Sequence, residues 1–222
     1  MATIAEGPRT SPLERNWWLR APAVLVAPRS VFVSLRDESE EAVEERQEPL
    51  TAMVALAGIA AVLATPVARS MLNDGSSWLI VPVWAFIGGS FYGLAAYWVG
   101  GGLLFGACRR LGGLGSYRRS RHVLALSMAP LVLSLFTLWP IRIAIYGEWF
   151  FRTGGNDYGP GDQAFNYLVL GSFAWSGLLL VIGVRTVHGW SWGRSLAATG
   201  LAASLPVFIL IGTHAHLTGG LN

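Results

Sequence analysis

Charge is scarce in this sequence of 222 residues: only 13% are Asp, Glu, Lys or Arg, and five long stretches contain none of the four. These stretches cover residues 49–68, 75–108, 122–141, 163–184 and 195–222, and each is rich in Leu, Val, Ile, Ala, Trp and Phe. A helix needs about 20 apolar residues to cross the hydrocarbon core of a bilayer. The sequence therefore predicts an all-α, polytopic membrane helix bundle with five transmembrane helices, at about residues 50–72, 78–107, 121–146, 164–187 and 195–217.

Lysine is absent, so all 16 basic residues are Arg, which we interpret as a sign of a GC-rich coding sequence and a bacterial source. The arginines gather in the first 48 residues and in the connections 109–121 and 185–194, whereas the other two connections are mainly acidic. Cytoplasmic loops are enriched in basic residues. We therefore expect a multi-pass protein of the cell (plasma) membrane, with its amino terminus in the cytoplasm and its carboxyl terminus outside.

Two arginines oppose this rule, because Arg69 and Arg142 lie near the predicted outer ends of spans one and three. We interpret them as side chains that reach the membrane interface or pair with the outer carboxylates Asp74 and Glu148. The alternative is an anion site near the outer face.

Residues 1–48 are predicted to form a cytoplasmic segment, and residues 49–222 the transmembrane domain. Within the segment, residues 17–35 mix apolar side chains such as Phe32 and Leu35 with spaced arginines, which is typical of short amphipathic helices lying in the inner interface. Residues 37–48 include seven acids and are predicted to be a solvated helix or linker. The alternative is a contact between this acidic run and the arginine-rich connection on the same face.

Chemical groups for catalysis are missing from the predicted spans. Their centres contain no ionisable residue, and there is no paired carboxylate, no HExxH motif and no Walker lysine. The single Cys108 has no partner for a disulfide within the chain, and the spacing of His214 and His216 suits no closed metal site. We predict a protein that is not an enzyme and holds no cofactor and no metal.

Two residue sets are the candidate sites. The pI near 9.4 reflects basic residues placed where a membrane protein meets anionic lipid, which favours lipid headgroups over nucleic acid as partners. The candidate lipid-binding or partner-binding residues are Arg109, Arg110, Arg118, Arg119 and Arg121. Small residues four apart let helices approach closely, and the second span contains two such pairs, within this chain or in a homodimer. These candidate helix-packing residues are Gly89, Gly93, Gly102 and Gly106.

Four segments carry a resemblance to a known family. Residues 27–36 (APRSVFVSLR), 111–119 (LGGLGSYRR), 124–131 (LALSMAPL) and 180–190 (LVIGVRTVHGW) together resemble bacterial members of the Yip family. These are five-span membrane proteins named for interacting with Ypt and Rab GTPases. The resemblance implies a cytoplasmic amino terminus, five helices and no catalytic residues, and its eukaryotic members act in Golgi and endoplasmic-reticulum trafficking.

The leading hypothesis is a non-enzymatic adaptor, scaffold or accessory subunit that binds another membrane protein, or itself as a homo-oligomer, or organises lipid. The absence of charge at the span centres and the arginine-rich connection support it. The alternative is a small oligomeric transporter or permeability protein. Its path would be lined by the polar residues Asn166, Tyr167, Ser172 and Ser176 of the fourth span.

Overall fold

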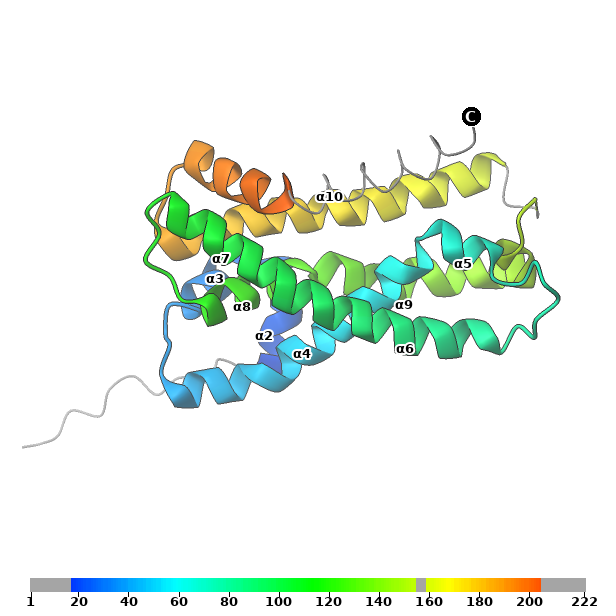
Figure 1. The fold of residues 1–222 in the computed structure, drawn as a ribbon, viewed down its shortest axis with the longest axis horizontal. Helices are drawn as coiled ribbons and strands as arrows, with labels where there is room; N and C mark the ends of the chain where they lie inside the picture. The colour runs from blue at the N-terminus through cyan, green and yellow to red at the C-terminus, as the bar shows by residue number, and fades with distance from the viewer. Residues whose placement is uncertain (1–16, 155–158, 205–222) are drawn as a thin grey trace, which may run out of the picture.

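The computed structural model describes residues 17–154 and 159–204, and all regular structure in them is helical. The elements are α2 (Trp17–Ala23), α3 (Pro28–Ser34), α4 (Glu40–Leu63), α5 (Pro66–Ser70), α6 (Ile80–Ala95), the π-helical turn η1 (Ala96–Gly100), α7 (Gly101–Arg110), α8 (Tyr117–Ser127), α9 (Ala129–Tyr146), the 3₁₀ turn η2 (Gly147–Phe151) and α10 (Pro160–His188). Residues 192–204 are also helical. The long helices run roughly parallel to one axis of the molecule (Figure 1).

Three helical runs are long and apolar enough to cross a membrane: Ile80–Arg110, Tyr117–Phe151 and Pro160–His188. They correspond to the predicted second, third and fourth spans, and the first of them begins two residues later than predicted. The first run continues from α6 through the π turn η1 into α7 without a break. The second run bends at Met128, directly before α9, which carries Pro130 in its first turn.

The predicted first span, residues 50–72, is not one helix. Helix α4 begins at Glu40 in the acidic run and ends at Leu63, and α5 starts at Pro66. Proline offers no backbone N–H and disfavours helical backbone in the residue before it. Thr65 is accordingly extended, and its side chain caps α5 by accepting a hydrogen bond from the N–H of Ala68. Of the predicted fifth span, residues 195–204 are helical and the remainder lies outside the described residues.

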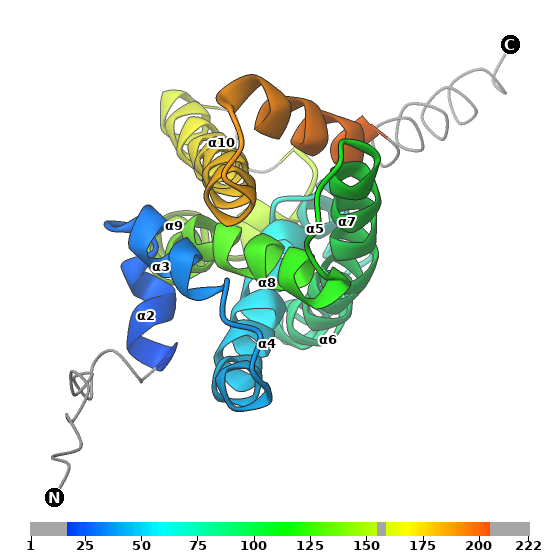
Figure 2. The same ribbon diagram turned by 90° about the vertical axis from the view of Figure 1, so that its left-hand side faces the viewer.

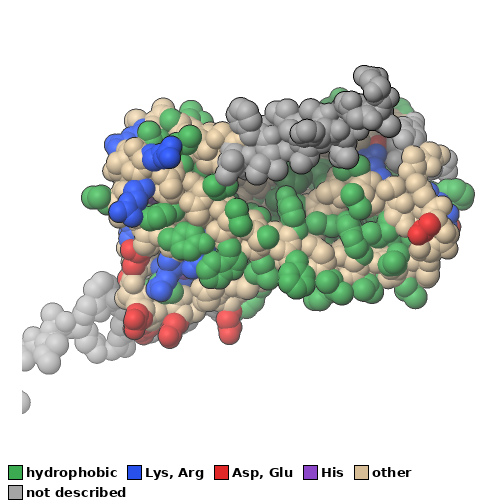
Figure 3. Space-filling model, viewed as in Figure 1, with side chains coloured by type: hydrophobic (Ala, Val, Ile, Leu, Met, Phe, Trp, Pro, Cys, Tyr) green, Lys and Arg blue, Asp and Glu red, His purple; other side chains and the backbone are tan. Residues whose placement is uncertain are grey.

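The two ends of the bundle differ in charge. The connections 111–116 and 189–191 lie at the same end as α3, which we call the arginine-rich end, whereas α5 and η2 lie at the opposite end (Figure 1). Charged side chains gather at the arginine-rich end, and apolar side chains cover the visible flank (Figure 3). The exposed apolar side chains include Phe86 and Phe91 of α6 and Leu170 of α10. An apolar surface of this extent is typical of contact with lipid.

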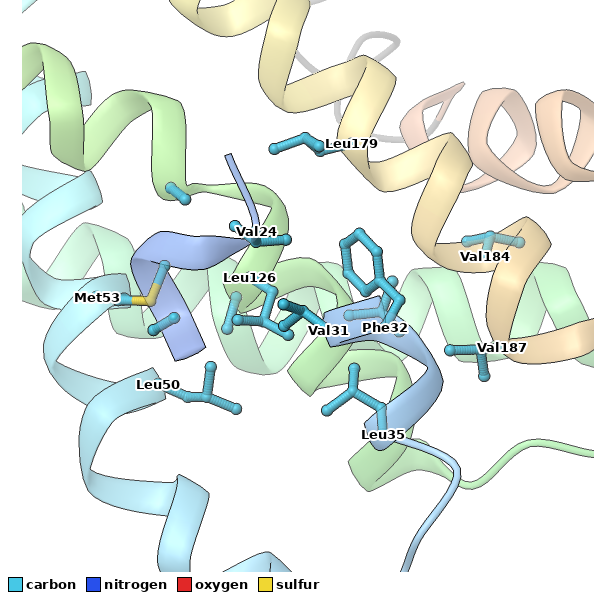
Figure 4. Packing of buried hydrophobic residues seen from close by; sticks show 14 of the residues in the cluster. Val24, Val31, Phe32, Leu35, Leu50, Met53, Leu126, Leu179, Val184 and Val187 are labelled. Carbon is cyan, nitrogen blue, oxygen red and sulfur yellow. The ribbon is translucent and has the colours of Figure 1, made fainter. Parts of the chain in front are cut away.

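Helices α2 and α3 are present as expected, and their apolar residues divide between the protein interior and the surface, where Trp18, Leu19 and Val33 are exposed. Val24, Phe32 and Leu35 are fully buried, and they point into the space between α4, α8 and α10 (Figure 4). Helix α3 lies so close to α10 that a Cβ atom on Gly183 would come within 2.8 Å of the Phe32 ring. The buried residues of this segment therefore pack against protein, since α2 contacts α4 and α3 contacts α10.

Candidate functional site

Three of the five predicted binding arginines are exposed at the arginine-rich end. Arg109 and Arg110 form the last turn of α7, and Arg118 lies in the first turn of α8. Within the described part of the chain, none of the three pairs with a carboxylate. Leu114, in the connection between the two helices, is 99% exposed. We call Arg109, Arg110, Leu114 and Arg118 the exposed arginine surface.

Helix electrostatics explains part of this arrangement. The carboxyl end of a helix carries partial negative charge, so Arg109 and Arg110 stabilise the end of α7. Arg118 is at the positive end of α8, where a cation is unfavourable. The Ser116 hydroxyl caps α8, because it accepts a hydrogen bond from the backbone N–H of Arg119 at 3.0 Å. Arg118 therefore has no role in capping. Its position suits an interaction outside the chain better than helix stability.

Arg119 is engaged within the molecule. Its guanidinium lies 2.9 Å from a carboxylate oxygen of Glu38 and donates a hydrogen bond to the carbonyl of Arg36 at 3.2 Å. The Ser116 hydroxyl also donates to Glu38. The alternative interpretation of the acidic run, a contact with the arginine-rich connection, thus applies to Glu38. The other acids at the start of α4 are exposed.

Arg121 is buried, with only 7% of its surface exposed, and it is surrounded by aromatic rings. Its guanidinium carbon lies 3.7 Å from the centre of the Trp98 ring, 4.8 Å from that of Tyr117 and 5.0 Å from that of Tyr97. Such cation–π contacts stabilise a desolvated charge. The π turn η1 supplies two of the rings, and Gly101 leaves room, since a Cβ there would lie 2.3 Å from Arg121 Cγ. Arg121 therefore joins α8 to the run Ile80–Arg110 and is largely buried.

Arg46 is a second buried arginine that contacts α8, and it is not among the site residues predicted from the sequence. Arg46 is fully buried, its Nε donates a hydrogen bond to Nδ1 of the buried His122 at 3.0 Å, and its Nη1 donates to the Asp37 carbonyl at 2.8 Å. Burial lowers the pKa of Arg46, and the nearby charge of Asp37 opposes that shift. Arg46 follows Val43 by three residues and precedes Leu50 by four, so it continues the apolar stripe of α4. That spacing could have marked it as a buried charge.

The two predicted glycine pairs differ in their surroundings. Gly89 and Gly93 lie against α4: a Cβ on Gly89 would be 2.5 Å from Ile59 Cα, and one on Gly93 would be 2.2 Å from the Val54 carbonyl oxygen. Gly58 of α4 completes this contact, since its Cβ would lie 2.0 Å from the Gly89 carbonyl oxygen. These three glycines bring the backbones of α4 and α6 together.

The second pair has space around it. A Cβ on Gly102 would make an ordinary contact with the Tyr117 ring at 3.6 Å, and a Cβ on Gly106 would meet no atom within 4 Å. No close approach of helices depends on this pair within the described residues. Close packing of this helix against α8 takes place one residue earlier, at Gly101.

At the opposite end, Arg142 and Asp162 form a buried ion pair, with 2% and 4% of their surfaces exposed. Arg69 lies 3.6 Å from the same carboxylate, and Asn166 accepts hydrogen bonds from Arg69 at 2.8 Å and from Arg142 at 3.0 Å. The carboxylate that pairs with both arginines is thus Asp162, in the first turn of α10, and not Asp74 or Glu148. A carboxylate is favourable at this end of a helix. The cluster connects α5, α9 and α10.

A pocket of about 220 Å³ lies among α4, α6, α8, α9 and α10. Its lining is mostly apolar, and of the four residues expected to line a transport path only Ser176 contributes to it. Asn166 belongs to the ion cluster, Tyr167 is 70% exposed, and the Ser172 hydroxyl donates to the Leu168 carbonyl. These four residues do not share one lining.

Metal-binding groups do not gather anywhere in the described residues, where no cluster of three or more His, Cys, Asp or Glu side chains is found. Cys108 is buried in the apolar core near the end of α7. His214 and His216 lie outside the described residues.

The helical architecture, the apolar flank and the three long apolar runs define a multi-pass membrane protein. The Yip1 domain matches residues 15–214, which is most of the chain, and the protein therefore belongs to the Yip1 domain family. The resemblance to the Yip family predicted from the sequence is confirmed. No curated protein and no solved structure shows significant similarity to it.

Proposed function

We propose that this protein is a non-enzymatic adaptor, scaffold or accessory subunit that uses the exposed arginine surface to contact anionic lipid or a partner membrane protein. The observation that carries the proposal is the exposure of three arginines without carboxylate partners around an exposed leucine. Leucine beside arginines is typical of surfaces that enter the headgroup region of a membrane.

The proposal includes the topology expected from the sequence. With five spans in the cell membrane, the arginine-rich end faces the cytoplasm, the amino terminus lies inside and the carboxyl terminus outside. The positive-inside rule supports this orientation, because the connections 111–116 and 189–191 lie at one end of the bundle with their flanking arginines. The exposed arginine surface then meets the anionic inner leaflet or the cytoplasmic side of a partner.

The test removes the charge and keeps the fold. Arg109, Arg110 and Arg118 are replaced together by Gln, and a matched variant replaces all three by Lys. Each basic residue near an anionic surface contributes about 1 kcal/mol, so the Gln variant should lose about 100-fold in affinity while the Lys variant retains most of it. The tagged proteins are purified from their own membranes in lipid-preserving nanodiscs, and companions and retained anionic lipids are quantified by mass spectrometry. Equal recovery in all three proteins would contradict the proposal.

The rival function, a small oligomeric transporter or permeability protein, rests on the pocket among α4, α6, α8, α9 and α10, which we call the central pocket. The Ser176 hydroxyl is buried and has no hydrogen-bond partner among the described residues, and it lines that pocket. A polar group of this kind is unfavourable unless a ligand or water satisfies it. Solute flux through the purified protein in sealed vesicles, lost in a correctly folded Ser176→Leu variant, would favour transport over the adaptor proposal.

A further inference from the structure

A second cluster of arginines surrounds a pocket of about 370 Å³ at the arginine-rich end, between α3 and the end of α10. Arg29 is the second residue of α3, Arg36 follows that helix, and Arg185 lies in the last turn of α10. Val33 and Trp190 supply an apolar part of the lining. Figure 2 looks onto this end and shows α8 between α3 and α7, so this pocket is separate from the exposed arginine surface.

The positive charge around the pocket is not neutralised by the protein. The lining contains no carboxylate, and no described carboxylate forms an ion pair with Arg29, Arg36 or Arg185. Arg36 donates one hydrogen bond to the Thr186 carbonyl. The Arg29 side chain forms no hydrogen bond with the described residues, and the buried Nε of Arg185 has no acceptor. Three guanidinium groups with unused donors around one pocket are a site that an anion would complete.

Phosphate matches these donors. A guanidinium presents two parallel N–H groups to two oxygens of a phosphate, and this geometry makes arginine the preferred residue for phosphate recognition. Carbonyl oxygens at the end of α10 would repel an anion, but Arg36 covers that of Thr186, and the N–H of Trp190 donates to that of Arg185 at 3.1 Å. Two of the carbonyls at the end of α10 thus already accept hydrogen bonds.

The surface next to the pocket favours a lipid as the source of the phosphate. Ile182, Leu178 and Trp175 precede Arg185 by 3, 7 and 10 residues, so they follow one face of α10 away from the pocket. Leu178 is 52% exposed and Trp175 is 38% exposed. An acyl chain can lie along this stripe while its headgroup occupies the arginines.

We infer that Arg29, Arg36 and Arg185 bind the phosphate of an anionic phospholipid headgroup, with an acyl chain lying on α10 along Leu178 and Trp175. The inference rests on the proposed function in one respect, which is that the arginine-rich end meets an anionic leaflet. It adds a specific lipid site to the general attraction expected of the exposed arginine surface.

The test uses the purified full chain in a neutral maltoside detergent with three probes: dioctanoyl phosphatidylglycerol, dioctanoyl phosphatidylcholine and inorganic phosphate. Binding is measured by native mass spectrometry and by the rise in thermal stability that a ligand of the folded state produces. The double variant Arg29→Gln with Arg185→Gln is compared with Arg109→Gln plus Arg110→Gln, which removes the same charge outside the pocket. Arg29→Gln alone serves as a variant that breaks no contact within the described protein.

The wild type should bind phosphatidylglycerol more tightly than either other probe. A charge-assisted hydrogen bond contributes about 1.5–3 kcal/mol, so Arg29→Gln should weaken binding at least about tenfold and the pocket double variant about 100-fold, against less than about threefold for the control. Equal losses in both double variants would overturn the pocket, because general charge attraction would then suffice. Inorganic phosphate bound as tightly as phosphatidylglycerol would overturn the lipid as source. Normal occupancy of the pocket with unchanged lipid and partner recovery in the Arg109, Arg110 and Arg118 variant would count against the proposed function alone.

Discussion

Replacing Gly93 with alanine tests the close approach of α4 and α6 directly. The added methyl carbon would lie 2.2 Å from the Val54 carbonyl oxygen, and real Cβ atoms essentially never come within 3.0 Å of another atom. The two helices must therefore separate by about 0.8 Å at this point, from 2.2 to 3.0 Å. The obstacle is a backbone carbonyl, which cannot rotate away as a side chain can.

Separation of the helices weakens the neighbouring contacts as well, because Gly58 and Gly89 depend on the same short distance. Adding a methyl group to a closely packed interior costs about 1–3 kcal/mol, and we expect the upper part of this range for Gly93→Ala. In a chain of this size each kcal/mol lowers the midpoint of thermal unfolding by about 2–4 °C. The midpoint is measured in detergent by size-exclusion chromatography after heating.

Gly106→Ala is the matched control, since it makes the same chemical change in the same continuous helix. Nothing lies within 4 Å of the Cβ position of Gly106. Alanine favours helix over glycine by about 1 kcal/mol, so this variant should equal or slightly exceed the wild type in stability. Equal midpoints for Gly93→Ala and Gly106→Ala would refute the close packing of α4 on α6.

Two further predictions concern the opposite end and the orientation. Asp162→Leu should lower stability by about 3–5 kcal/mol because it leaves Arg142 buried without its carboxylate. Adding Arg142→Met should recover part of this loss. A double variant that is less stable than the single variant would contradict a direct ion pair. In a Cys108→Ala background, a membrane-impermeant maleimide applied to intact cells should label Glu148→Cys but label Leu114→Cys only after lysis, and the reverse pattern would contradict the proposed orientation.

The membrane-crossing helices could be predicted from the sequence because the bilayer imposes one simple requirement. Every backbone polar group in hydrocarbon must be satisfied within the segment, so a long stretch without charge becomes a helix. The break after Leu63 was harder to foresee, since proline inside a membrane helix can either kink it or end it. Thr65 decides the outcome here: its hydroxyl caps α5 and thereby stabilises a new helix start at Pro66.

The roles of the arginines could not be predicted in the same way. In the sequence Arg118 and Arg121 are equivalent members of one basic cluster, and their spacing of three residues on α8 places them near the same face of the helix. Arg121 is nevertheless buried against the rings of η1, whereas Arg118 is exposed. Whether an arginine is buried depends on aromatic residues such as Trp98 that are distant in sequence. The closest helix contact likewise depends on Gly58, which belongs to no glycine pair in its own helix.

The glycine contact also separates the two candidate functions. Gly58 and Gly93 hold α4 against α6 and at the same time line the central pocket beside Ser176. A solute path through this pocket would change when Gly93→Ala moves the two helices apart, because its walls would move with them. An adaptor that binds through arginines at the end of the bundle would retain its partner as long as the variant remains folded. Measured below its unfolding midpoint, Gly93→Ala should therefore leave lipid and partner recovery unchanged if the adaptor proposal is correct, and alter solute flux if the transporter alternative is correct.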